Sequence, residues 1–168
     1  MSLTFNETRK NEIEHILKRY PTKQAALLPV LWIAQEEFGW VSDEVIGLVA
    51  KELDLSPAHV FGVVTFYTMY HRRPVGRYHL QVCRTLPCAL MGCDKILSHL
   101  KERLSVGEGE TTSDQKFTLS TVECLASCGT APAVRINERY YENLTTETVD
   151  KILEELGEGN EPNLGNGG

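Results

Sequence analysis

The sequence predicts an α/β fold class in which a helical bundle precedes a sheet domain, and three observations predict it. Over about the first 70 residues, apolar side chains recur at the three- and four-residue spacings of helices. From residue 74 onward, segments with strand alternation and segments with helical spacing follow one another. Two cysteine pairs lie where predicted strands end. We therefore expect a helical domain over residues 1–73, a sheet domain over residues 74–156 and a disordered tail over residues 157–168.

Four helices are expected in the N-terminal domain. The first two cover residues 6–20 and 23–38, and Gly39 is a suitable C-terminal cap for the second. Ser42 and Ser56 are expected to cap the third and fourth helices, because a serine hydroxyl can accept a hydrogen bond from a free N–H of the first turn.

The sheet domain is expected to contain two strands and a hairpin. Apolar and more polar residues alternate over residues 78–83 and again over residues 116–123, which is typical of half-buried strands. Residues 133–137 and 139–142 are expected to form the short hairpin. Residues 107–114 are expected to be a loop.

Two helices are expected to complete the sheet domain. Helical spacing begins at Cys88 and places one apolar stripe along the chain, formed by Leu90, Cys93, Leu97, Leu100 and Leu104. Thr145 is expected to cap the last helix, which ends at Gly157.

Four cysteines form two pairs. Cys83 and Cys88 follow the first predicted strand as C-x4-C, and Cys124 and Cys128 follow the second as C-x3-C. Open α/β folds place ligands at the ends of their strands, so we expect the two pairs to lie at one edge of the sheet. Four thiolates together need a positive centre, which an iron–sulfur cluster or a zinc ion supplies.

The spacing leaves three kinds of chemistry open. Ligation by four cysteines is usual for a [2Fe–2S] cluster. Zinc ribbons use pairs separated by two to four residues, which these gaps also permit. Thiol–disulfide exchange typically uses C-x-x-C, a motif that this sequence does not contain. The fifth cysteine, Cys93, shares a stripe with leucines and is expected to be a small buried thiol.

Composition and motifs argue against several other classes of protein. The net charge is −6 and the one dense basic run is His71-Arg72-Arg73, so we expect no nucleic-acid partner. The first residues lack the apolar core of a secretory signal, and no segment approaches the roughly 20 apolar residues of a membrane span. We therefore expect a reducing compartment. Neither G-x-G-x-x-G nor a P-loop occurs, so a partner is expected to supply any electrons.

Several motifs taken together resemble one family, the thioredoxin-like [2Fe–2S] subunit of NADH:quinone oxidoreductase, which is the small iron–sulfur subunit of respiratory complex I. The resemblance runs from about Tyr20 to Leu156. Its motifs are GVVTFY at 62–67, Cys83 with LPCALMG at 86–92, VECL at 122–125 with Cys128, and Ala131-Pro132 with Asn137.

The resemblance implies a thioredoxin-like [2Fe–2S] ferredoxin domain after the helical bundle. It implies that Cys83, Cys88, Cys124 and Cys128 ligate one [2Fe–2S] cluster. It also implies a partner subunit that binds FMN and NADH, and further partners among the other iron–sulfur subunits of the peripheral arm. The cluster would exchange single electrons with that flavin, so the chain would act in the oxidoreductase without an NADH or flavin site of its own.

The resemblance implies a cytoplasmic protein that is peripheral to the inner face of the plasma membrane, without direct insertion, or on the matrix side in a mitochondrion. Two alternatives stay open. NAD-linked hydrogenases and formate dehydrogenases reuse this type of subunit, and a zinc-stabilised interaction module would carry no electrons.

One residue departs from the family pattern inside the second cysteine pair. The family often has glycine where this chain has Ala126. If the backbone there needs a positive φ angle, alanine is expected to strain the loop.

Overall fold

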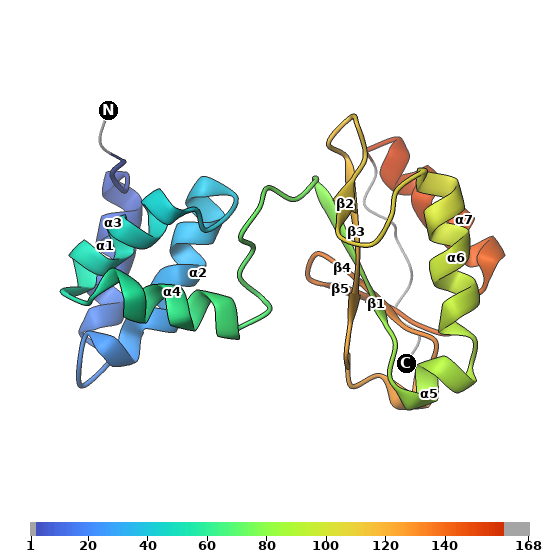
Figure 1. Ribbon diagram of the computed structural model, residues 1–168, viewed down its shortest axis with the longest axis horizontal. Helices are drawn as coiled ribbons and strands as arrows, with labels where there is room; N and C mark the ends of the chain where they lie inside the picture. The colour runs from blue at the N-terminus through green and yellow to red at the C-terminus, as the bar shows by residue number, and fades with distance from the viewer. Residues whose placement is uncertain (1–2, 160–168) are drawn as a thin grey trace. The chain divides into compact units, whose positions relative to one another are not determined.

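The computed structural model describes residues 3–159 and contains two compact units, and the boundary between them along the chain falls between Val75 and Gly76. Figure 1 shows the helices of the first unit and the mixed sheet of the second. The larger part of the predicted tail, residues 160–168, lies outside the described residues. Among residues 3–159, no helix is long and apolar enough to cross a membrane.

The first unit is helical, as predicted. Its helices are α1 (Glu7–Leu17), a 3₁₀ turn (Gln24–Ala26), α2 (Leu27–Phe38), α3 (Asp43–Leu53) and α4 (Pro57–Phe66). Their apolar stripes enclose a core that includes Ile13, Val30, Leu31, Val49, Leu53 and Val60.

Prolines explain two differences from the predicted helices. The first helix ends at Leu17 rather than at residue 20, because Pro21 disfavours helical backbone in the residue before it. The second α-helix starts at Leu27 rather than at residue 23, which places Pro29 in the first turn. In the first turn of a helix, backbone N–H groups have no helical acceptor, so the missing N–H of Pro29 costs no hydrogen bond. If the helix started earlier, the proline ring would clash with a carbonyl of the preceding turn.

The predicted helix caps are confirmed. The hydroxyls of Ser42 and Ser56 accept hydrogen bonds from the N–H groups of Val45, at 3.1 Å, and His59, at 3.2 Å. Gly39 ends α2 in the left-handed region, with φ at 79°.

The second unit is built on a mixed sheet of order β2-β3-β1-β4-β5. The strands are β1 (Tyr78–Cys83), β2 (Glu110–Thr111), β3 (Phe117–Val122), β4 (Val134–Ile136) and β5 (Arg139–Tyr141). β1 runs parallel to β3, and the other pairs are antiparallel. The expectation of a loop over residues 107–114 is wrong in part, because Glu110 and Thr111 pair with β3 as an edge strand too short for its alternation to be recognised.

The helices of this unit are α5 (Leu86–Leu90), α6 (Cys93–Leu104) and α7 (Thr146–Gly157). The prediction of a single helix from Cys88 is wrong, because Gly92, with φ at 91°, separates α5 from α6. Leu90 accordingly lies outside the apolar stripe and is 77% exposed. In Figure 1, α6 and α7 lie on the same side of the sheet, and their apolar stripes share its core with Leu80, Leu119 and Val134.

Asn137 connects the β4–β5 hairpin to the start of β1. It lies in the two-residue turn with φ at 51°. Its side-chain oxygen accepts from the N–H of His79 at 2.9 Å, and its side-chain nitrogen donates to the carbonyl of Arg77 at 3.0 Å. One side chain therefore satisfies two backbone groups at the start of β1, one in the strand and one in the residue before it.

We expect Asn137→Ala to lower the free energy of unfolding by about 3 kcal/mol. The two lost hydrogen bonds contribute about 1 kcal/mol each, and the left-handed backbone about 1 kcal/mol more. Asn137→Gly loses the bonds but tolerates the backbone, so its expected loss is about 2 kcal/mol. Urea denaturation measures both variants, and equal stability of Asn137→Gly and the parent protein would contradict the role of the side chain.

Candidate metal centre

The parallel pairing of β1 and β3 sets the position of the cysteines. Cys83, the last residue of β1, pairs in register with Val122, the last residue of β3. The loop that carries Cys124 and Cys128 therefore starts beside the loop that carries Cys88. The expectation that both pairs follow neighbouring strand ends is confirmed.

Cys83 and Cys88 are buried, with exposed fractions of 3% and 2%. Each of the two thiols affects the pKa of the other. The helix α5 starts at Leu86, so Cys88 lies in its first turn, near the end at which free N–H groups favour negative charge. The Sγ atom of Cys83 lies 3.5 Å from the Thr85 hydroxyl and 3.9 Å from the carbonyl oxygen of Glu123.

Cys124 and Cys128 are exposed. They lie in the irregular segment after β3, where a 3₁₀ turn (Cys128–Thr130) begins at the second of them. The N–H of Ala126 donates to the Sγ atom of Cys124 at 3.3 Å, and φ at Ala126 is 60°. The positive φ angle on which the predicted strain depends is thus present, and it turns an N–H towards a cysteine sulfur.

The two buried thiols differ in their acidity. Burial raises the pKa of the Cys83 thiol, but hydrogen bonds from the Thr85 hydroxyl and from the backbone at Thr85 and Leu125 outweigh it, so the net pKa is lowered. Burial raises the pKa of the Cys88 thiol to about 11, and the neighbouring Cys83 acts in the same direction. The surroundings therefore favour the charged form at one sulfur of the pair.

The donor set of the two cysteine pairs fits a [2Fe–2S] cluster. Within residues 3–159, no three His, Cys, Asp or Glu side chains are gathered as a metal site. Four cysteines are the usual ligands of a [2Fe–2S] cluster and are also a ligand set for zinc, so this finding does not separate the two centres. The N–H of Ala126, which is directed at the Cys124 sulfur, suits the negative charge of a cluster.

The fifth cysteine is buried as expected. Cys93 is 2% exposed at the first position of α6 and belongs to the same core as Leu100 and Leu119. Burial raises the pKa of its thiol, and the carboxylate of Asp94 adds to this effect. An uncharged thiol packed among apolar side chains is consistent with a structural role.

Sequence reasoning missed the contacts that surround the sulfurs. Thr85 is the residue before α5, and its hydroxyl contacts Cys83. A threonine before Leu-Pro is a recognisable start of a helix, but nothing in the sequence shows that its hydroxyl is directed at a cysteine instead of the helix. The exposed ion pair between Arg84 and Glu123, at 3.8 Å, also links the two cysteine-bearing loops.

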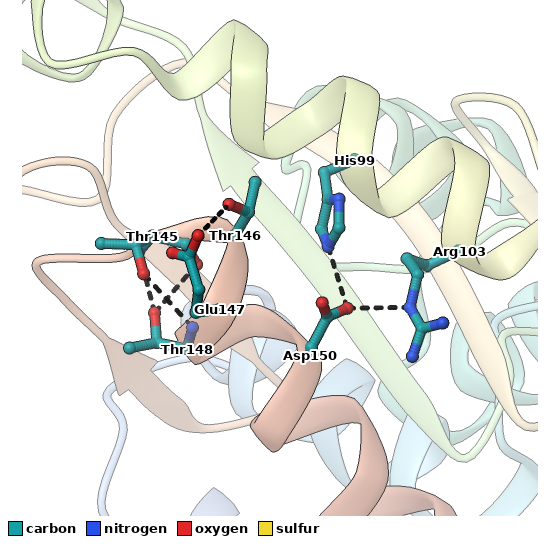
Figure 2. Close-up of polar contacts among 7 residues, drawn as sticks. All are labelled: His99, Arg103, Thr145, Thr146, Glu147, Thr148 and Asp150. Atoms are coloured by element: carbon teal, nitrogen blue, oxygen red, sulfur yellow. Dashed lines mark hydrogen bonds and ion pairs between the residues drawn. The ribbon is translucent and has the colours of Figure 1, made fainter.

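A second polar cluster joins α6 to α7 (Figure 2). One carboxylate oxygen of Asp150 lies 2.9 Å from Nε2 of His99 and 2.8 Å from Nε of Arg103. In the same figure, Thr145 and Thr148 exchange the hydrogen bonds of a capping box at the start of α7. These contacts fix the last helix, and they agree with a structural role for His99.

Comparisons with known proteins agree with this architecture. The family model for the thioredoxin-like [2Fe-2S] ferredoxin matches residues 13–157. One subunit of the NADH-quinone oxidoreductase of Rickettsia felis is 43% identical over 157 residues, which are 92% of this chain and 94% of that protein. The corresponding subunit from Rhizobium meliloti is 42% identical over 147 residues, which are 88% of each chain.

Solved structures with the same fold include a hydrogenase chain. A chain of the air-oxidised NAD+-reducing [NiFe]-hydrogenase superposes with a TM-score of 0.70 at 20% identity. The match covers 79% of this chain but 23% of the hydrogenase chain, so the hydrogenase chain is several times longer.

The left-handed backbone at Ala126 leads to a prediction. We expect Ala126→Gly to raise the free energy of unfolding by about 0.5–1 kcal/mol, because relief of the strain exceeds the entropy cost of glycine. Ala89→Gly, in the helix α5, is the matched control and should lower it by about 1 kcal/mol. Thermal and urea denaturation compare the stability of the two variants, and an equal loss of stability in both would contradict backbone strain at Ala126.

Proposed function

Since this chain belongs to the thioredoxin-like [2Fe-2S] ferredoxin family, we propose that it is the electron-transfer subunit of an NADH:quinone oxidoreductase and holds one [2Fe–2S] cluster. The family resemblance drawn from the motifs is confirmed, and so is the predicted fold class of a helical bundle followed by a thioredoxin-like domain. The single observation that carries the proposal is the register of β1 and β3, which brings both cysteine pairs to one end of the sheet.

Cys83, Cys88, Cys124 and Cys128 would hold the cluster, which supplies reversible one-electron transfer when bound. The buried pair fixes one side of the site within the core. The exposed pair leaves the other side open to an approaching protein. The N–H of Ala126 at Cys124, and the backbone at Thr85 and Leu125 at Cys83, would offset the negative charge of the thiolates.

The electrons are proposed to come from a partner subunit that carries FMN and oxidises NADH, within a complex that includes other iron–sulfur subunits. The chain then acts in an enzyme as one of its subunits rather than as a site for NADH. Such a complex would place it at the cytoplasmic side of the membrane, or at the matrix side in a mitochondrion. The names of relatives at 42–43% identity support the assignment of this chain to an NADH-quinone oxidoreductase.

The equivalent subunit of an NAD-linked hydrogenase or formate dehydrogenase is the second candidate. Its support is weaker, because the hydrogenase chain is 20% identical and shows a common fold only. A zinc-stabilised module is the third candidate, and the colour of the protein distinguishes it, since zinc proteins are colourless.

The cluster is tested by counting iron and sulfide in anaerobically purified protein and by recording an EPR spectrum after reduction with dithionite. About two irons and about two sulfides per chain are expected, together with a spin-half signal, because a [2Fe–2S] centre has this composition. Zinc without a signal would overturn the proposed function while leaving the fold in place.

Substitutions test the four ligands one by one. Cys83→Ser, Cys88→Ser, Cys124→Ser and Cys128→Ser are each expected to lose most of the iron, because each removes a thiolate that binds the metal. Cys93→Ser is the matched control and should retain the iron and the EPR signal. Unchanged iron in any of the first four variants, or loss of iron in the control, would show that the ligands are assigned wrongly.

The surface beside Cys88 leads to a prediction about the partner. Three large apolar side chains of α5 and of the residue after it, Leu86, Leu90 and Met91, are 70%, 77% and 62% exposed. Exposed apolar clusters of this kind favour protein contact. We expect Leu90→Asp to weaken binding to the flavin-carrying subunit about tenfold or more, as measured by calorimetry.

Tyr140→Ser is the control for this effect, because Tyr140 is an exposed side chain of β5 in the same unit. Equal weakening by both variants would show that α5 has no special part in the contact. The cluster content of both variants should stay unchanged.

A further inference from the structure

Thr85 occupies a helix N-cap without capping the helix. Ser42, Ser56 and Thr145 each accept a hydrogen bond from an N–H of the helix that follows, as side chains at this position usually do. Thr85 has the same extended backbone, with ψ at 169°, but its side chain makes no capping hydrogen bond to α5. Its hydroxyl therefore has a different use.

The hydroxyl of Thr85 lies 3.5 Å from the Sγ atom of Cys83. Either atom can donate while Cys83 is a thiol, but a thiolate that ligates iron has no proton, so the hydroxyl of Thr85 must then be the donor. Thr85 is half-buried and Cys83 is buried, so water screens this contact less than it would at an exposed site.

We propose that Thr85 is a positioning residue that raises the reduction potential of the cluster held by Cys83. This inference rests on the proposed function. Reduction adds one electron to the centre without forming or breaking a bond, and it increases the negative charge on the sulfurs. A hydroxyl dipole directed at one of them stabilises the reduced state more than the oxidised state, which raises the potential.

The test is a redox titration of the cluster monitored by EPR in Thr85→Val, a variant that keeps the shape of the side chain and removes the donor. At the potential where the parent protein is half reduced, the ratio of reduced to oxidised cluster should fall about three- to tenfold. A tenfold change corresponds to about 59 mV for one electron. Thr85→Ser keeps the hydroxyl and should stay within a small fraction of that shift.

Thr112→Val is the control for general destabilisation. Thr112 also uses its hydroxyl, accepting from the N–H of Phe117 at 3.0 Å, but Phe117 is the first residue of β3, at the opposite end from Val122. This variant should leave the potential unchanged even if it unfolds more easily. An equal shift in Thr112→Val and Thr85→Val would overturn the inference.

The outcomes separate this inference from the proposed function. A parent protein without a [2Fe–2S] signal overturns the proposed function. A normal signal with the same potential in Thr85→Val and Thr85→Ser overturns the role of Thr85 alone. Should Thr85→Val hold no cluster, Thr85→Ala repeats the comparison, and loss of the cluster in both overturns the inference, because a tuning hydroxyl is not needed to hold iron.

Discussion

The parallel pairing of β1 with β3 is the constraint on which the rest of the site depends. Parallel neighbours need a crossover connection, and here the crossover contains α5 and α6. The register then makes Cys83 and Val122 partners, so two loops that are distant in sequence start side by side. Asn137 holds the beginning of the same strand from the neighbouring hairpin, through its hydrogen bonds to Arg77 and His79.

In the proposed centre, the charge of the four thiolates would be offset differently on its two sides. Cys83 and Cys88 are inside the core, where each negative charge needs a nearby donor. The hydroxyl of Thr85 and the backbone at Thr85 and Leu125 provide donors to Cys83 there. Cys124 and Cys128 are exposed, so water and the N–H of Ala126 can donate hydrogen bonds to their sulfurs. Protein donors are therefore concentrated where water is excluded.

Much of the fold could be predicted from the sequence because it depends on local signals. Serine caps and strand alternation depend only on residues close together in the sequence, and the predicted strand ends give the positions of the cysteine pairs in the fold. The break between α5 and α6 was missed because Gly92 interrupts a helical spacing that continues across it. The short edge strand β2 was missed because its two residues pair with β3 through a contact that no local pattern records. The direction of the Thr85 hydroxyl is set by tertiary structure and could not be predicted either.

The separation of the two strands in the sequence has a consequence for the chain while it is being synthesised. Cys83 leaves the ribosome well before Val122, its partner in the register, and Cys128 follows later still. A contact between segments so far apart has to wait for the intervening helices and for closure of a long loop. A nascent chain that has not passed Cys128 therefore lacks part of the proposed site, so the proposed centre cannot be completed until this late segment has been synthesised.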